Sequence, residues 1–181
     1  MALRCTDHLI QEHRLILRAV YVLKAMADQA EDLKIPEAQD VELLHFFRRF
    51  ADDHHQAKEE SVLFPALRNC DLPNTSGPLG QMMFEHEQER SLIEGLEDSL
   101  RTRNHSDFAH YGHRMAEVLS NHIYKEDNIL FDLVEKAIAK ETDERIVEEM
   151  MRFDESLLPD KYDELAHTVN QLEWKYLGKA A

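Results

Sequence analysis

The sequence predicts an all-α protein, built as a four-helix bundle with two additional helices at its C-terminal end. Three observations support this fold class. Of the 181 residues, 43% are hydrophobic, which is ordinary for a globular domain, whereas glycine and proline number only five each. The abundant Leu, Glu, Ala, Lys and Arg favour helices. Apolar residues recur at steps of three and four over long stretches, which is the period of a helix.

The first two predicted helices make up the first half of the bundle. The first runs from about Asp7 to Ala30, and His13 lies within its apolar stripe. The second begins near Pro36, because proline suits the first turn of a helix. It extends to about Phe64 or Arg68, and we expect Pro65 to end or kink it. One row of this helix, at steps of four, holds Phe47, Ala51, His55, Glu59 and Leu63.

The second half repeats this plan after a loop at Asn69–Pro78, which is rich in turn-forming residues. The third helix is predicted at about Leu79–Arg103. A short turn at Asn104–Ser106 leads to a long fourth helix at about Asp107–Ala139. Its expected inner face holds Phe108, Met115, Leu119, His122, Glu126, Ile129 and Leu133.

Two shorter helices are predicted after the bundle. One covers about Asp143–Phe153, and the other begins near Pro159 and ends before Gly178. We therefore expect residues 1–140 to form the bundle and residues 141–181 to form a helical extension packed on it.

The charge and composition exclude several classes of function. A formal net charge of −15 argues against nucleic-acid binding and against binding to anionic membranes, because both need a basic face. No apolar run approaches the roughly 20 residues that span a bilayer, and residues 1–13 lack the apolar core of a signal peptide. Cys5 and Cys70 form no close pair, so free thiols and a cytoplasmic location are expected.

One short pattern occurs twice in the chain and carries most of the chemistry. His55 is followed four residues later by Glu59, and His122 is followed four residues later by Glu126; each pair precedes an apolar cluster. In each half of the chain, the preceding helix carries a Glu-His dipeptide. These dipeptides are Glu12-His13 and Glu85-His86.

Residues four apart on a helix lie on the same face, so each pattern places an imidazole beside a carboxylate. A carboxylate inside a helical core is costly unless it is paired or bound to a metal. A single histidine on an apolar stripe is more often a hydrogen-bonded core residue, but four histidines on four inner faces with two matched carboxylates indicate metal binding. Imidazole with carboxylate favours iron, manganese or zinc, and such bundles commonly hold two metals bridged by carboxylates.

Glu89 is a further candidate ligand. It lies about one turn after His86 on the apolar stripe of the third helix, where the first half has Ile16. It is either an additional ligand or the partner of a buried arginine.

Three neighbouring residues have weaker patterns. Glu60 and Asp127 each lie one residue after the predicted carboxylates and are alternatives to them. His54 adjoins His55 but points about 100° away around the helix, so it is expected to be exposed or to support the site from outside.

The chain resembles the hemerythrin-like family, the HHE cation-binding domain. The matching motifs are QEH at His13, HHQAKEESVLFPAL from His54, FEHEQER at His86 and NHIYKEDNILF at His122. They span about Asp7 to Ala139. The resemblance implies a non-haem di-iron centre within an antiparallel up-down-up-down four-helix bundle. It further implies His13, His55, His86 and His122 as terminal ligands and Glu59 and Glu126 as bridging carboxylates.

One departure from the family pattern affects the expected function. Oxygen-carrying hemerythrins have a second histidine one turn after that of the third helix, and this chain has Arg90 there. The missing histidine changes the ligand set and weakens the case for reversible oxygen carriage. With no attached regulatory or iron–sulfur repair domain expected, the chain looks like a stand-alone bacterial-type member.

The expected function is that of a di-iron protein that binds or reacts with dioxygen, peroxide or nitric oxide. The alternative is an iron-handling or iron/oxygen-sensing module that acts through a partner, which leaves room for a protein partner or a homodimer. No residue stands out as a general acid or nucleophile, so the sequence does not establish an enzyme. The residues alone do not distinguish two irons from zinc or manganese.

Overall fold

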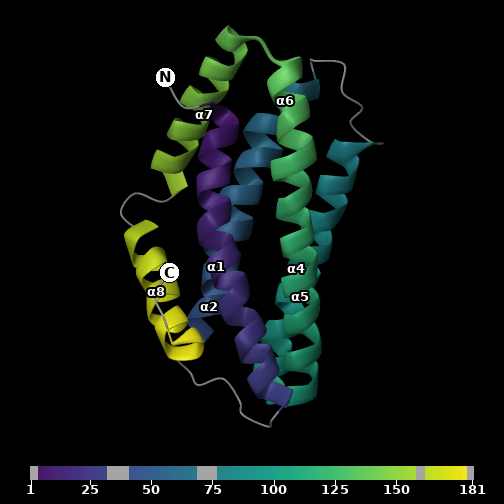
Figure 1. Cartoon of the computed structure of the whole chain (residues 1–181), viewed down its shortest axis with the longest axis vertical. Coiled ribbons are helices and arrows are strands. Elements are labelled where there is room, and N and C mark those ends of the chain that lie inside the picture. The colour runs from purple at the N-terminus through teal and green to yellow at the C-terminus, as the bar shows by residue number, and fades with distance from the viewer. Residues whose placement is uncertain (1–3, 32–40, 69–76, 158–161, 179–181) are drawn as a thin grey trace.

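The computed structural model describes residues 4–31, 41–68, 77–157 and 162–178, and these residues are predominantly helical with no strand among them (Figure 1). The predicted all-α class is therefore confirmed. In chain order the elements are α1 (Cys5–Glu31), α2 (Glu42–Phe46), η2 (Phe47–Gln56), η3 (Glu59–Leu63), α3 (Phe64–Arg68), α4 (Pro78–Thr102), α5 (His105–Lys125), η4 (Glu126–Leu130), α6 (Phe131–Ala137), α7 (Lys140–Leu157) and α8 (Tyr162–Leu177). No helix among the described residues is both long and apolar enough to cross a lipid bilayer.

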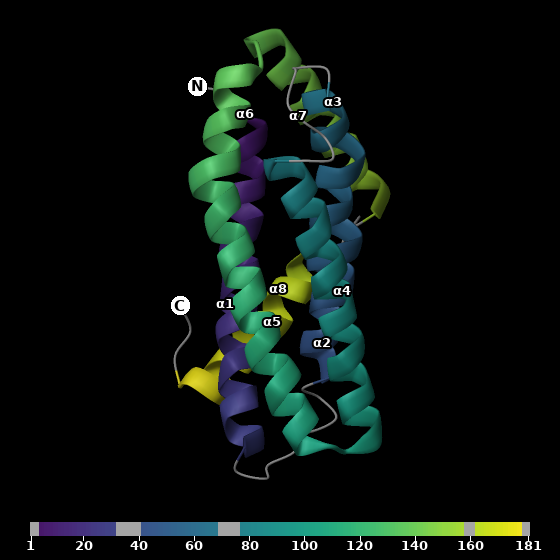
Figure 2. The ribbon, with the colours of Figure 1, turned by 90° about the vertical axis from the view of Figure 1, so that its right-hand side faces the viewer.

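Four long helical rods lie side by side (Figures 1 and 2). The first rod is α1, the second runs from α2 through α3, the third is α4, and the fourth runs from α5 through α6. The first rod packs against the second and the fourth, and the third rod packs against the same two. Each rod thus has two neighbours, and the four inner faces meet along a common axis.

The rods begin and end at recognisable signals. Pro78 starts α4 directly after Gly77, whose φ of 89° is strained for residues that carry a Cβ. The fourth rod begins at His105, two residues before the predicted start. There the Asn104 side chain accepts a hydrogen bond from the backbone N–H of Asp107 at 3.1 Å. Asn104, the first residue of the predicted turn, is therefore the N-cap of this rod, which ends at Ala137, two residues before the predicted end.

The second rod is π-helical over most of its length. At the end of η3, the backbone N–H of Phe64 donates to the carbonyl of Glu59, five residues earlier. The expectation that Pro65 ends or kinks this helix is wrong in its first part, because the helix continues to Arg68. Pro65 has no N–H to donate. It comes just after the point at which the backbone hydrogen bonds change from the five-residue spacing of η3 to the four-residue spacing of α3.

A shorter π-helical turn, η4, shifts the inner face of the fourth rod by one residue. Ile129 was expected on this face, but it is 50% exposed, and Leu130 is buried instead. Val134 is buried and follows Leu130 at a step of four, in place of the expected Leu133. The extra residue in the π turn explains the shift, because it rotates every later side chain around the helix axis.

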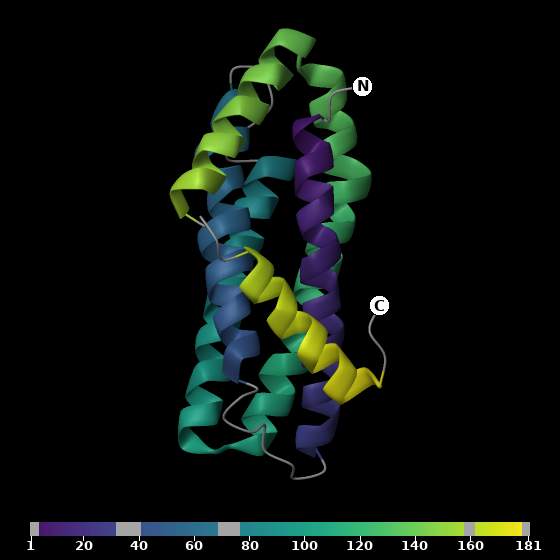
Figure 3. The same cartoon turned by 90° about the vertical axis from the view of Figure 1, so that its left-hand side faces the viewer.

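The C-terminal helices lie along one side of the rods (Figure 3). Helix α7 packs against α1 and η3, and α8 crosses α1 and α2. Helix α7 begins three residues earlier than predicted and extends to Leu157. Pro159, the predicted start of the last helix, lies outside the described residues, and α8 ends before Gly178 as expected.

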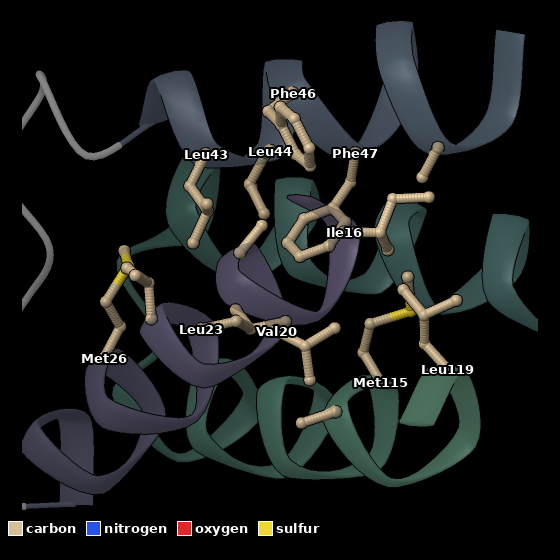
Figure 4. Packing of buried hydrophobic residues seen from close by; sticks show 14 of the residues in the cluster. Ile16, Val20, Leu23, Met26, Leu43, Leu44, Phe46, Phe47, Met115 and Leu119 are labelled. Carbon is tan, nitrogen blue, oxygen red and sulfur yellow. The ribbon is translucent and has the colours of Figure 1, made fainter. Parts of the chain in front are cut away.

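Among the described residues, the buried apolar side chains form two separate clusters. One lies toward the end of the bundle where α1 finishes, and the residues drawn in Figure 4 belong to it; among them are Ile16, Phe47 and Met115. The other, which includes Leu9 and Leu130, lies toward the end where α1 begins. Along each rod a short stretch of buried polar residues separates the two clusters.

Candidate metal centre

The polar layer between the two apolar clusters holds all four predicted histidines and both predicted bridging carboxylates. Every rod contributes at least one of them, and each of these residues is at most 2% exposed. They are His13 on α1, His55 and Glu59 on the second rod, His86 on α4, and His122 and Glu126 on the fourth rod.

These six side chains form two overlapping groups with metal-binding geometry. The first joins His13 and His55 to both carboxylates, and the second joins His86 and His122 to the same two carboxylates. Within each group the potential ligand atoms all lie within 4.8 Å of one another. Glu59 and Glu126 belong to both groups and therefore lie between the two histidine pairs.

The Nε2 atoms of the histidines point toward the carboxylates and toward each other. They are 3.0 Å apart in the pair His13–His55 and 3.2 Å apart in the pair His86–His122. Glu126 Oε2 lies 3.2 Å from the Nε2 atoms of both His13 and His122. Glu59 Oε2 lies farther away, 3.8 Å from His55 Nε2 and 3.5 Å from His86 Nε2.

The opposite nitrogen of each histidine, Nδ1, donates to a carboxylate of a neighbouring rod. For the histidines of the second, third and fourth rods, the carboxylate comes from the preceding rod in the chain. For His13 on the first rod, it comes from the fourth rod, so the four bonds form a closed circuit around the bundle. Such a bond fixes the tautomer, so that the lone pair of Nε2 faces the centre, and it orients the ring for a metal. The bonds join His55 to Glu12 at 2.7 Å, His86 to Glu60 at 2.7 Å, His122 to Glu85 at 3.1 Å and His13 to Asp127 at 2.7 Å.

Two of the supporting carboxylates, Glu60 and Glu85, are held in their ionised form. Burial alone would raise the pKa of Glu85, but His122 and Lys125 outweigh it and lower that pKa to about 2. Burial likewise opposes the effect of His86 and Arg90 on Glu60, whose pKa is nevertheless lowered. These two carboxylates therefore accept the Nδ1 protons of His86 and His122 throughout the physiological pH range, which keeps the orientation of both rings constant.

Without a metal, the centre favours protonated histidines. Burial alone would lower the pKa of His13, but the carboxylates of Asp127 and Glu126 raise it to about 9. Burial is also outweighed at His86, where the carboxylates of Glu59 and Glu60 raise the pKa to about 9. The centre therefore attracts positive charge strongly, whether it comes from protons or from metal ions.

The residues fit metal ions better than they fit one another. None of the four oxygen atoms of Glu59 and Glu126 has a hydrogen-bond partner among the described residues, although both side chains are fully buried. Buried carboxylate oxygens without a partner cost several kcal/mol. The paired Nε2 atoms add a second mismatch, because two lone pairs face each other unless a proton or a cation lies between them. Metal ions beside both carboxylates remove both mismatches.

Phenylalanines shield one histidine of each pair. The ring of Phe131 stacks on His13 with ring centroids 5.6 Å apart, and the ring of Phe64 stacks on His86 with centroids 6.0 Å apart. Phe64 and Phe131 are the final residues of the two repeated segments that begin at His55 and His122. The repeat therefore supplies an aromatic cover for a histidine of another rod, as well as the ligands.

Glu89 lies next to the centre but belongs to neither ligand group. It is buried, and its Oε2 accepts a hydrogen bond from Gln56, while its Oε1 has no partner among the described residues. Burial raises the pKa of its carboxyl. The alternative of a buried arginine partner is wrong, because the guanidinium of Arg90 pairs with Asp52, Glu60 and Glu87 instead.

Sequence reasoning misjudged several supporting residues. Glu60 and Asp127 were treated as alternatives to the bridging carboxylates, but each binds a histidine Nδ1. Glu12 and Glu85 were noticed only as neighbours of histidines. The repeat itself carried the signal, because all four carboxylates occupy matching positions in the two halves.

His54 is buried at 3% exposure, so of the two alternatives expected for it, an exposed ring is wrong and a ring that supports the site from outside is confirmed. Its Nε2 lies 3.2 Å from Glu12 Oε1, which places it beside the centre without making it part of either ligand group. Adjacent residues both point inward here because π-helical winding spreads successive side chains differently from an α-helix.

The model of one protein family matches residues 5–134, and its description is the hemerythrin HHE cation-binding domain. No curated protein and no solved structure matches the chain. The matched segment includes all six side chains of the two ligand groups and all four carboxylates that orient the histidines. The chain therefore belongs to the hemerythrin HHE cation-binding family.

Proposed function

We propose that this chain is a non-haem di-iron protein that binds or reacts with a small molecule such as dioxygen, peroxide or nitric oxide. The observation that carries this proposal is the sharing of Glu59 and Glu126 by two histidine pairs. One ion would lie between His13 and His55 and the other between His86 and His122. Both carboxylates would bridge the ions, which gives four buried oxygens their missing partners.

The proposal includes the bundle topology expected from the sequence. We propose that the four rods form an antiparallel up-down-up-down bundle, with residues 1–140 as the metal-binding unit and residues 141–181 as an extension. The ring of contacts between the rods supports this arrangement. Bundles of this kind build their metal sites from side chains on facing helices.

The choice of iron rests on the ligand chemistry and on the family. Imidazole nitrogens with carboxylate oxygens suit iron, manganese and zinc better than magnesium or calcium. Two histidines and bridging carboxylates at each ion leave coordination positions open for an external molecule, as in other non-haem iron sites. Zinc or manganese in both positions would preserve the site but remove the proposed redox function.

Iron bound here would supply one-electron chemistry toward oxygen, peroxide or nitric oxide. The chain's own residues would fix the geometry and limit the access of water. The Nδ1 bonds hold the rings, the apolar clusters close the site on both sides, and Phe64 and Phe131 cover two of the ligands. Arg90, engaged in three ion pairs, offers no imidazole where oxygen carriers have one. This difference favours reactivity over reversible oxygen carriage.

We propose Glu89 as an additional carboxylate for the ion between His86 and His122. Its support is the buried, unpartnered Oε1 and the electrostatic influence of both histidines on its carboxyl. The corresponding position in the first half is the buried Ile16. The two ions would therefore differ in their ligands, and the open positions would favour one of them.

A second candidate function is an iron-handling or iron/oxygen-sensing module that acts through a partner. One observation favours it: Lys58, beside the centre, forms an ion pair with Asp154 of α7 at 2.5 Å. Through this contact a helix outside the four rods touches the surroundings of a ligand.

Anaerobic reconstitution tests the proposed function. The purified chain is loaded with ferrous iron, the bound iron is counted, and optical spectra are followed on adding oxygen, peroxide or nitric oxide in turn. We expect about two irons per chain and spectral changes with at least one of these molecules. A matched pair of variants controls the assignment: His122→Ala should lose iron, and His110→Ala, on an exposed face, should keep it. Two bound irons that are inert to all three molecules would favour the sensing function, and no bound iron would refute both.

A further inference from the structure

The internal repeat offers a comparison between two equivalent lysines. Lys58 lies three residues after His55, and Lys125 lies three residues after His122. Each binds the carboxylate that orients the preceding histidine. The Nζ of Lys58 lies 2.5 Å from Glu12 Oε1, and the Nζ of Lys125 binds Glu85 Oε1. Both lysines therefore stabilise a carboxylate–histidine pair from outside.

The two lysines differ sharply in exposure. The side chain of Lys58 is 1% exposed, whereas that of Lys125 is 32% exposed. Helix α7 is responsible, because it packs against α1 and η3 over the first half (Figure 3). No described residue outside the four rods pairs with Lys125, so only the first half has this cover.

The contact from α7 to Lys58 is specific. Asp154 Oδ1 lies 2.5 Å from Lys58 Nζ and 3.4 Å from His54 Nε2. The ring of Phe153, the residue before it, lies 6.2 Å from the ring of His54. A continuous set of charged contacts thus runs from Asp154 through Lys58 and Glu12 to His55.

This cluster is complete without another cation. Glu12, His54 and Asp154 have ligand atoms close enough to hold a metal. The ammonium of Lys58 already lies 2.5 Å from both carboxylates. The lysine therefore supplies the positive charge that a metal would provide elsewhere, and the cluster serves as a structural link.

We propose that Asp154 is a positioning residue for the metal centre, acting through Lys58 and Glu12 to hold the imidazole of His55. The proposal rests on the proposed di-iron function. The ion between His13 and His55 and the docking of α7 then stabilise each other, because a coupling between two equilibria acts equally in both directions. In the described part of the chain, no helix outside the four rods makes such a link to the ion between His86 and His122, and Lys125 is partly exposed to solvent there.

The coupling between α7 and the metal centre depends on the burial of the Lys58 ammonium. A buried ammonium that loses one of two carboxylate partners either draws the other partner toward itself or admits water. In either case Glu12 loses its fixed position, and the bond from His55 Nδ1 to Glu12 Oε2, 2.7 Å long, becomes less well defined. Loss of such an outer bond commonly weakens metal binding about 10- to 100-fold.

The first test uses hydrogen exchange and needs no variant. Exchange of the α7 amides is compared between the full chain with two ferrous ions and the same chain stripped by a chelator, under anaerobic conditions. We expect metal loading to slow exchange in α7 by about tenfold or more, on the scale of the affinity effect above. Equal exchange in α7 with and without bound metal would overturn the proposal.

The second test follows metal release to ferrozine from anaerobically loaded protein. We expect two phases in the wild type, one for each ion. Asp154→Asn should accelerate one phase by about 10- to 100-fold and leave the other unchanged, and Asp154→Glu should restore much of the wild-type rate. Lys125→Met should accelerate only the other phase, while Glu148→Gln, in an exposed pair on α7, should change neither.

The outcomes separate the two proposals. A wild type that holds two irons, with unchanged release from Asp154→Asn, would refute the role of Asp154 and leave the di-iron function intact. A wild type that holds no metal would refute the di-iron function and the role of Asp154 together. Faster iron release from one position of Asp154→Asn, with loss of the metal-dependent protection of α7 in that variant, would support both.

Discussion

The imidazoles of His13 and His55 face each other with their Nε2 atoms 3.0 Å apart, while the Nδ1 atom of each ring is bound to a carboxylate. This arrangement leaves both Nε2 lone pairs directed at the same small space. His86 and His122 repeat it on the other side of the two shared carboxylates. The stability of this symmetrical layer and its affinity for metal therefore depend on the charges that surround the four rings.

Stability of the metal-free chain should decrease as pH rises from about 6.5 to about 9. The folded-state pKa values of His13 and His86, about 9, exceed the ordinary value of 6.5. Their protonation therefore stabilises the fold fully below about pH 6.5, and this stabilisation is lost as pH rises through about 9. The expected loss is on the order of 3 kcal/mol for each histidine. Urea unfolding in chelator across this range measures it, and a constant or rising stability would contradict the assigned charges.

Either bridging carboxylate should be essential for full metal content. Glu59→Gln and Glu126→Gln keep the shape of the side chain but remove the negative charge that the two proposed ions would share, since both carboxylates belong to both ligand groups. We expect each variant to hold clearly less metal than the wild type, because a neutral amide bridges metal ions poorly. Glu117→Gln, on an exposed surface pair, is the matched control. Metal analysis after identical loading checks this, and full occupancy in both variants would refute the bridging role.

Replacing a carboxylate that orients a histidine should lower the affinity for metal more than it lowers the metal content after full loading. Glu60→Gln weakens the bond to His86, and Asp127→Asn weakens the bond to His13, without removing a ligand in either case. Each should lower metal affinity about 10- to 100-fold. Competition with a chelator of known affinity gives the measurement, with Glu148→Gln, in an exposed pair on α7, as the control. Affinities equal to that of the control would show that the Nδ1 bonds are not needed.

Glu89 should make the two ions inequivalent. Glu89→Ile copies the side chain that the first half carries at Ile16 and removes a buried carboxyl without a full set of partners. We expect iron content to stay the same while the two iron environments become more alike. Mössbauer spectra of the iron-loaded protein measure this directly. Spectra that show the same difference between the irons before and after the substitution would exclude Glu89 as a ligand.

The repeat made much of the centre predictable from the sequence. His55 with Glu59 and His122 with Glu126 recur at steps of four, and this spacing alone places them on one face. The histidines at positions 13 and 86 followed from the apolar stripes around them. Local periodicity was sufficient for these residues because each His–Glu pair stays on one face despite the π-helical turns, with Nε2 and Oε2 3.8 Å apart for His55 and Glu59 and 3.2 Å apart for His122 and Glu126.

Other features depend on contacts that periodicity does not encode. The π-helical winding of the second rod turned His54 inward, and the π turn η4 turned Ile129 outward. The bond from Lys58 to Asp154 joins residues that are distant in the sequence and lie on different helices. Such contacts arise from the packing of α7 on the rods, which no local pattern specifies. The cytoplasmic location and the identity of the small molecule stay predictions.

The most direct test of the central claim is anomalous X-ray scattering at the iron edge from crystals of the iron-loaded chain. We predict two peaks of anomalous density, one between His13 and His55 and the other between His86 and His122, both in contact with Glu59 and Glu126. A layer with no anomalous density, or with the six side chains turned away from the peaks, would contradict the account.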